Sequence, residues 1–135
     1  MPGKVAMMMK QYEFTCGHGE HLLEATVTLC GTDIAVIIAG GTRQHIGAVA
    51  LAEPRKSLAH DGVSATASVL CLTGHKEDLW ARSAALEIAA SCQATTFVSV
   101  GIHIDNATSG DLENFTKNFQ QLLADIKAIL HNLKC

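Results

Sequence analysis

The sequence is poor in aromatic residues, which make up only 4% of its 135 residues, whereas apolar residues as a whole make up 48%. Tyr12 and Trp80 are the single tyrosine and the single tryptophan. A hydrophobic core must therefore be built from alanine, valine, isoleucine and leucine. Few aromatic side chains are available for ligands that bind by stacking on them, such as nucleic-acid bases.

Clusters of positive charge are also absent. Ten lysines and arginines stand against thirteen acidic residues, the formal net charge is -3, and the basic residues are scattered along the chain. Proteins that bind the phosphate backbone of nucleic acids concentrate basic residues on one surface. The charge pattern therefore argues against a nucleic-acid partner.

Cysteine motifs are missing as well. The five cysteines are odd in number and have no Cys-x-x-Cys spacing, which fits reduced thiols in the cytoplasm better than disulfides or a zinc knuckle. We expect four of them to fill positions in strands or helices. The first ten residues contain no long hydrophobic run, so we expect neither a signal peptide nor a membrane anchor.

Common catalytic and nucleotide motifs are not found either. Gly40-Gly41-Thr42 is not followed by the Gly-Lys-Ser/Thr of a P-loop, and Gly17-x-Gly19 lacks the third glycine of a dinucleotide fingerprint. The Gly-x-Ser-x-Gly motif of serine hydrolases is absent.

The hydrophobic pattern predicts a single α+β (mixed α/β) domain over residues 1–135, with an antiparallel-rich mixed sheet of about six strands covered by two helices. The first four predicted strands follow one another closely, so we expect them to form an antiparallel meander. We expect the fourth to be buried on both faces and to stop at Pro54. The predicted strands span 10–16, 23–29, 34–39, 46–52, 64–72 and 97–102, and the predicted helices begin at 77–78 and 111.

A polar segment stands between the third and fourth strands. Gly40 and Gly41 allow a partner to approach the main chain, and Thr42, Arg43 and His45 add a hydroxyl, a guanidinium and an imidazole. Together these groups could bind an anion.

Three further residues qualify as ligand contacts. Arg55 follows the rigid Pro54 and so has a fixed position that a carboxylate or phosphate could use, although a charged loop is usually just solvated. Ser64 and Thr66 are small enough to leave room for a ligand or another subunit, or to pack against a helix.

Histidines recur where predicted strands end. His103 and Asp105 are two residues apart and point to the same side of an extended chain. Together with His45 and His75 they provide enough imidazole and carboxylate groups for a divalent metal ion. A histidine at a strand end is more often a hydrogen-bonding residue than a metal ligand, so both interpretations stay open.

Three segments together resemble one known family. They are the stretch from Gly41 to Ala50 (GTRQHIGAVA), the stretch from Ser64 through His75 to Asp78, and the stretch from Val100 to Asn106 (VGIHIDN). In order and spacing they resemble the D subunit of gallate-type decarboxylases, the prenylated-flavin chaperone proteins.

The resemblance implies a non-enzymatic accessory protein that binds prenylated flavin mononucleotide (FMN), or FMN, and serves a UbiD-type decarboxylase of aromatic acids. From the chemistry of the residues, and not from a family binding motif, we expect the cofactor contacts among Gly40, Gly41, Thr42, Arg43, His45, Arg55, Ser64, Thr66 and His75, with a divalent metal ion at His45, His75, His103 and Asp105 as a further candidate.

We expect the apolar slot for the flavin ring to be lined by Ala48, Ala50, Ala65 and Ala67 and completed by the second subunit of a homodimer. Two other classes of function remain open. One is a small metal-dependent enzyme that uses the histidines and Asp105, and the other is a purely structural subunit of a decarboxylase.

Overall fold

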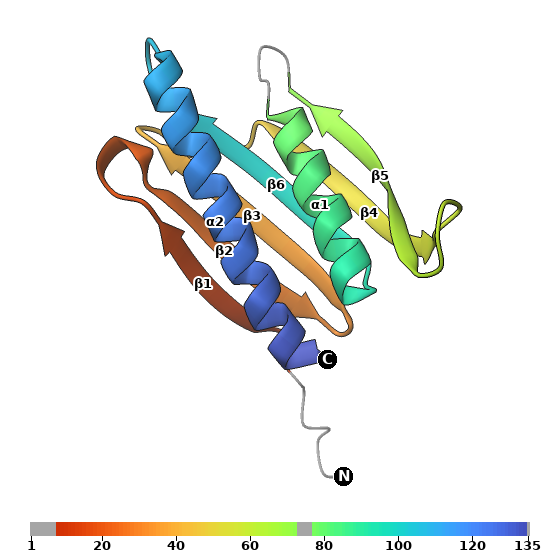
Figure 1. Cartoon of the computed structure of the whole chain (residues 1–135). Coiled ribbons are helices and arrows are strands. Elements are labelled where there is room, and N and C mark those ends of the chain that lie inside the picture. Colours follow the sequence, from red (N-terminus) through yellow and green to blue (C-terminus); the bar gives the residue numbers. More distant parts are fainter. Residues whose placement is uncertain (1–7, 73–76, 135) are drawn as a thin grey trace.

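The computed structural model describes residues 8–72 and 77–134, which form one six-stranded sheet and two α-helices (Figure 1). The elements are β1 (Lys10–Cys16), a 3-10 turn η1 (Gly19–His21), β2 (Leu23–Cys30), β3 (Asp33–Gly41), β4 (Ala48–Lys56), β5 (Val63–Cys71), α1 (Asp78–Cys92), β6 (Thr96–His103) and α2 (Ser109–Lys134). The predicted α+β class, with a mixed, largely antiparallel sheet and two helices, is confirmed.

The strands lie in the order β1-β2-β3-β6-β4-β5. All neighbouring strands are antiparallel except β3 and β6, which are parallel. The prediction of a four-stranded meander was therefore wrong, because β6 separates β3 from β4. The loop after β3 is long enough to step over one strand, since six extended residues reach about 20 Å while strands two places apart are separated by about 10 Å.

Strand β4 also differs from its prediction. Its alternate residues Ala48, Ala50 and Ala52 are buried, but Leu51 between them is 48% exposed, so only one face of the strand is covered. The strand runs through Pro54 to Lys56. Proline is tolerated there because β6 pairs with β4 only as far as Ala52, which leaves one side of β4 without a neighbour.

Both helices lie on the same side of the sheet, α1 over β4, β5 and β6 and α2 over β1 and β2 (Figure 1). Helix α1 approaches the sheet closely because its buried face is made mainly of alanines, including Ala81, Ala84 and Ala85. As a result Ala48 and Ala50, which we expected to line a ligand slot, are each 1% exposed and belong to the core. Ala65 and Ala67 of β5 are partly buried and pack against the same core, so the space expected for the flavin ring is filled by the protein itself.

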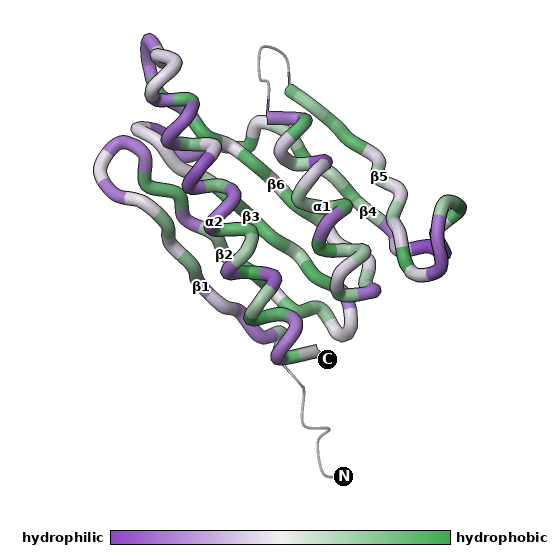
Figure 2. Tube along the Cα trace, in the orientation of Figure 1, coloured by the Kyte–Doolittle hydropathy of each residue, from purple (hydrophilic) through white to green (hydrophobic). Residues whose placement is uncertain are grey.

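Hydrophobic residues are concentrated in the central strands β3 and β6, and hydrophobic and hydrophilic residues alternate along α2 (Figure 2). Helix α2 buries Phe115, Phe119, Leu122 and Ile126, which recur at intervals of three and four residues. Four cysteines lie in regular elements as expected: Cys16 in β1, Cys30 in β2, Cys71 in β5 and Cys92 in α1. In the described part of the chain, neither helix is long and apolar enough to cross a membrane.

Helix α2 begins with a capping box. The Asp111 backbone N–H donates to Thr108 Oγ1 over 3.1 Å, and the Thr108 backbone N–H donates to Asp111 Oδ2 over 2.9 Å. Asp111 Oδ1 also lies 2.8 Å from His21 Nε2 in η1. The hydrogen bond from the Thr108 backbone, followed by the His21 contact, holds the pKa of Asp111 below its usual value.

Candidate functional site

The polar segment 42–47 leaves β3 and crosses the end of β6 to reach β4. Its first residue is fixed by the Thr42 backbone N–H, which donates to the His103 carbonyl over 2.8 Å. Its last is fixed by the Gly47 N–H, which donates to the Val100 carbonyl over 3.0 Å. The segment, which we call the crossing loop, is therefore attached to β6 at both ends. As the sequence predicted, its polar residues lie at one end of the sheet.

Two glycines make this crossing possible. Gly41 has φ +79°, and a Cβ there would meet the His103 carbonyl oxygen. A Cβ on Gly101 would occupy the position of the His45 carbonyl oxygen, because the crossing loop lies directly against β6 at that point. Side chains at these positions are excluded by sterics, so the close contact requires glycine.

His45, at the centre of the crossing loop, turns toward α1. Its Nε2 lies 3.2 Å from Glu77 Oε1, and the side chains of both residues are largely buried. Glu77 is the N-cap residue of α1, and the same Oε1 accepts a hydrogen bond of 3.4 Å from the Ile102 backbone N–H. Glu77 therefore joins the crossing loop, β6 and the start of α1.

Sequence reasoning assigned Glu77 only to the first turn of a helix and missed its place in the site. The one sequence feature connected with this contact is the glycine at position 47, because a Cβ on Gly47 would lie only 2.6 Å from Glu77 Oε2. The glycine leaves space for the carboxylate, but the contact spans thirty positions of the chain and no local pattern reveals it.

His103 forms a second histidine–carboxylate pair. Its Nε2 lies 2.9 Å from Asp105 Oδ1, and its ring meets the His45 ring edge to face, with centroids 6.2 Å apart. The predicted spatial proximity of His45, His103 and Asp105 is thus observed. Within residues 8–72 and 77–134, however, no three histidine, cysteine or acidic side chains are placed to hold a metal ion. His75 lies outside the described residues.

The remaining predicted contacts divide between two ends of the sheet. Thr42 and Arg43 are exposed on the crossing loop, whereas Arg55, Ser64 and Thr66 lie at the far ends of β4 and β5. Arg55 Nε donates to Thr66 Oγ1 over 2.8 Å. The structure therefore does not bring all the predicted contacts together.

The backbone donors where β3 passes into the crossing loop are already used. Gly40 is buried in β3, the Gly41 N–H donates to the Leu22 carbonyl over 3.2 Å, and the Thr42 N–H donates to His103. For an anion at this end, the exposed Arg43 guanidinium supplies a positive charge and charge-assisted hydrogen bonds.

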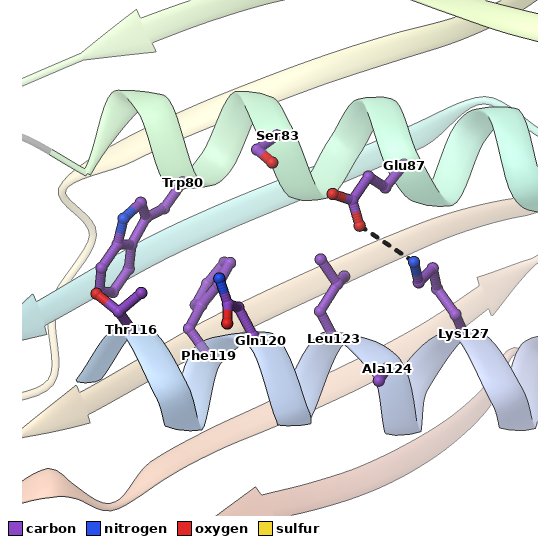
Figure 3. Close-up of a pocket in the computed structure, with 9 residues that line it drawn as sticks. All are labelled: Trp80, Ser83, Glu87, Thr116, Phe119, Gln120, Leu123, Ala124 and Lys127. Atoms are coloured by element: carbon purple, nitrogen blue, oxygen red, sulfur yellow. Dashed lines mark hydrogen bonds and ion pairs between the residues drawn. The ribbon is translucent and has the colours of Figure 1, made fainter. Parts of the chain in front are cut away.

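A separate groove lies between the two helices (Figure 3). Trp80 of α1 and Phe119 of α2 pack together there with ring centroids 4.8 Å apart, and Lys127 Nζ meets Glu87 Oε2 at 3.1 Å further along. The groove has a volume of about 210 Å³. Pockets for drug-sized ligands are usually about 300–1,000 Å³, so it is too small for a flavin nucleotide.

Residues 17–131, most of the chain, match the family model described as the prenylated flavin chaperone LpdD-like domain. The chain belongs to this family. The match includes the crossing loop, Glu77 and the end of β6, so the prenylated flavin chaperone domain contains the whole candidate site. Membership indicates a chaperone role connected with flavin.

The fold is also found in a chaperone complex for yeast 20S proteasome assembly, solved by crystallography. One chain of that complex is similar with a TM-score of 0.61 and 16% sequence identity, over 92% of this chain and 99% of that one. At this identity the likeness shows a shared fold alone. No curated protein matches the sequence significantly.

Proposed function

We propose that this protein binds prenylated FMN and delivers it to a UbiD-type aromatic-acid decarboxylase, without performing catalysis itself. The observation that carries the proposal is the match of residues 17–131 to the prenylated flavin chaperone family. The exposed arginine of the crossing loop supports the further proposal that the cofactor binds there.

The phosphate of the cofactor would bind at Arg43. The crossing loop is attached to β6 on either side of this residue, through Thr42 and Gly47. Holding the loop in place before the ligand arrives reduces the entropy lost on binding. The exposed guanidinium can pair with two phosphate oxygens, and such charge-assisted bonds are stronger than neutral ones.

The flavin ring would lie beside this phosphate position. Ile46 of the crossing loop is 57% exposed and Leu72 is 56% exposed. The two lie at the same end of the sheet, because the Leu72 N–H donates to the Gly47 carbonyl over 2.9 Å. Exposed apolar side chains next to a cationic group match a ligand that has an apolar ring system and an anionic tail.

Anaerobic titration with reduced prenylated FMN, with ordinary FMN as the comparison, tests the proposal. We expect the prenylated form to bind more tightly. Arg43→Ala should weaken binding by about 1.5–3 kcal/mol, or roughly 10- to 150-fold, because a hydrogen bond to a charged group is lost. Repeating the titration with chelator and with divalent metal decides whether a metal ion takes part.

Two other arginines serve as matched controls. Arg82→Ala changes an exposed arginine on α1 and should leave affinity unchanged. Arg55→Ala tests the other end of the sheet, where Ser64 and Thr66 also lie. If Arg55→Ala weakens flavin binding and Arg43→Ala does not, the cofactor phosphate binds at the Arg55 end of the sheet instead. Absence of flavin binding under every condition would refute the proposed function.

A further inference from the structure

The side of the sheet turned away from the helices, which we call the open face, has an apolar centre. One row across the strands consists of Ile37, Ser99, Val49 and Leu70, in the order β3, β6, β4 and β5. Ile37 is 50% exposed, Leu51 in the neighbouring row is 48% exposed, and Leu70 is 74% exposed. Large apolar side chains gathered in this way usually mark an interaction site.

Polar residues border this apolar centre. On the open face of β1 and β2 the corresponding positions are Glu13, Thr26 and Glu24, and toward the far end of β4 they are Glu53 and Arg55. An apolar centre inside a polar border is the usual anatomy of a protein–protein interface.

The sequences of the central strands are those of strands covered on both sides. Residues 34–39 of β3 and 48–52 of β4 are uninterrupted apolar runs, whereas β2 alternates apolar residues with Glu24, Thr26 and Thr28. Continuous apolar runs are typical of sheets with two covered faces, and alternation is typical of sheets with one face in water. The helices cover only one face of β3 and β4. The apolar sequences of these two strands therefore indicate that their other face is covered as well, by something outside this chain.

The size of the open face suits a second copy of the chain. Six strands about 4.8 Å apart, each about eight residues long, give a face of about 750 Å². Stable interfaces of standard size bury about 800 Å² on each partner. The small residue Ser99 of β6 lies between the larger Ile37 and Val49, so the same surface offers both a hollow and projections, as self-association about a twofold axis requires.

We propose that two copies of this protein associate through their open faces, sheet against sheet, to form a homodimer. The apolar centre, which includes Ile37, Leu51 and Leu70, is covered by the same residues of the partner copy. The inference rests on the exposed side chains and not on flavin binding, so it stands or falls independently of the proposed function.

Sedimentation velocity and light scattering on the full chain test the proposal. The wild type should have twice the mass of one chain. Leu51→Lys should raise the dimer dissociation constant by about 100-fold or more, because it buries a charge without a partner. Leu112→Lys, at a leucine of α2 that is 60% exposed on the helix layer, is the matched control and should remain a dimer.

A second variant keeps the dimer proposal testable if Leu51→Lys does not fold. Leu70→Glu changes a side chain that is already 74% exposed within one chain, so it should keep the fold, as circular dichroism would verify, and should also yield a monomer. A monomeric wild type at its highest soluble concentration would overturn the proposal. So would a Leu70→Glu variant that is folded and as fully dimeric as the wild type, because the interface would then lie elsewhere.

Discussion

At the scale of single residues, Gly101 controls the position of the candidate site. Gly101→Ala would place a methyl group where the His45 carbonyl oxygen now lies. Neither backbone can move without breaking the attachments of the crossing loop, so we expect a loss of about 1–3 kcal/mol of folding free energy. Chemical denaturation measures this loss, and cofactor affinity should fall with it.

Gly110→Ala provides the comparison for this prediction. A Cβ on Gly110, in the first turn of α2, would have Thr108 Oγ1 as its nearest neighbour at 3.6 Å, an ordinary contact. Alanine suits a helix better than glycine by up to about 1 kcal/mol. This variant should therefore be as stable as the wild type or slightly more stable. Equal destabilisation by the two substitutions would contradict the steric explanation.

Ser99 shows how a single residue can resist interpretation from sequence. It occupies a β6 position between Ile37 and Val49 and is 2% exposed. Its hydroxyl has no hydrogen-bond partner within the described chain. A serine in an apolar strand indicates neither burial nor exposure by itself, because its surroundings depend on neighbours brought in from two other strands.

At the scale of elements, Asp111 connects the start of α2 to η1 through Thr108 and His21. Because these contacts lower its pKa, the ionised form stabilises the folded state at neutral pH. That contribution is lost as the pH falls below about 4 and through the lowered pKa of the folded state. Asp111→Asn should therefore lower the melting temperature at pH 7, and the difference from wild type should shrink toward zero in acid.

Melting curves of both proteins from pH 7 to pH 2 would measure this convergence. Glu113→Gln, at an exposed acidic residue of the same helix, should have little effect at any pH. A difference between Asp111→Asn and the wild type that stays constant down to pH 2 would show that the charge of Asp111 is not what stabilises this junction.

The elements themselves were largely predictable from the sequence. Alternation marked β1 and β2, and the spacing of Phe115, Phe119 and Leu122 marked α2, because burial on one side leaves a periodic trace in the sequence. The place of β4 was not predictable in this way. Strands close in sequence usually pair, and nothing in residues 42–47 reveals that a strand made fifty residues later lies between β3 and β4.

The candidate site was predictable only in part, for a related reason. Thr42, Arg43 and His45 share one short loop, so their proximity follows from the sequence. The contact of His45 with Glu77 and the edge-to-face contact of His45 with His103 depend on the order of strands in the sheet. The separation of Arg55 from Arg43 follows from the length of β4, which continues past Pro54.

At the scale of the whole molecule, the proposed delivery of cofactor can be measured directly. An apo UbiD-type decarboxylase would be given prenylated FMN either free or already bound to this protein, and the recovery of decarboxylase activity would be followed. We expect several-fold faster or more complete recovery from the bound form. The reason is that Arg43 and the crossing loop lie at the surface, where a partner can approach the ligand.

Arg43→Ala supplies the control for delivery. If the protein carries the cofactor at the crossing loop, this variant should perform no better than free prenylated FMN, whereas Arg82→Ala should match the wild type. Equal recovery from free and bound cofactor would leave binding intact but would argue against a delivery role.

The central position of β6 also has a consequence for how the molecule comes into being. During synthesis the chain first makes the β1–β3 unit and the β4–β5 hairpin, and the strand that joins them appears only after α1. Until residues 96–103 leave the ribosome, β3 and β4 are edges with unpaired backbone groups, open to pairing with another chain. The sheet can close only through a pairing between segments far apart in sequence, which is a slow step in folding. A protein of a chaperone family is thus itself most vulnerable to aggregation until its sixth strand is in place.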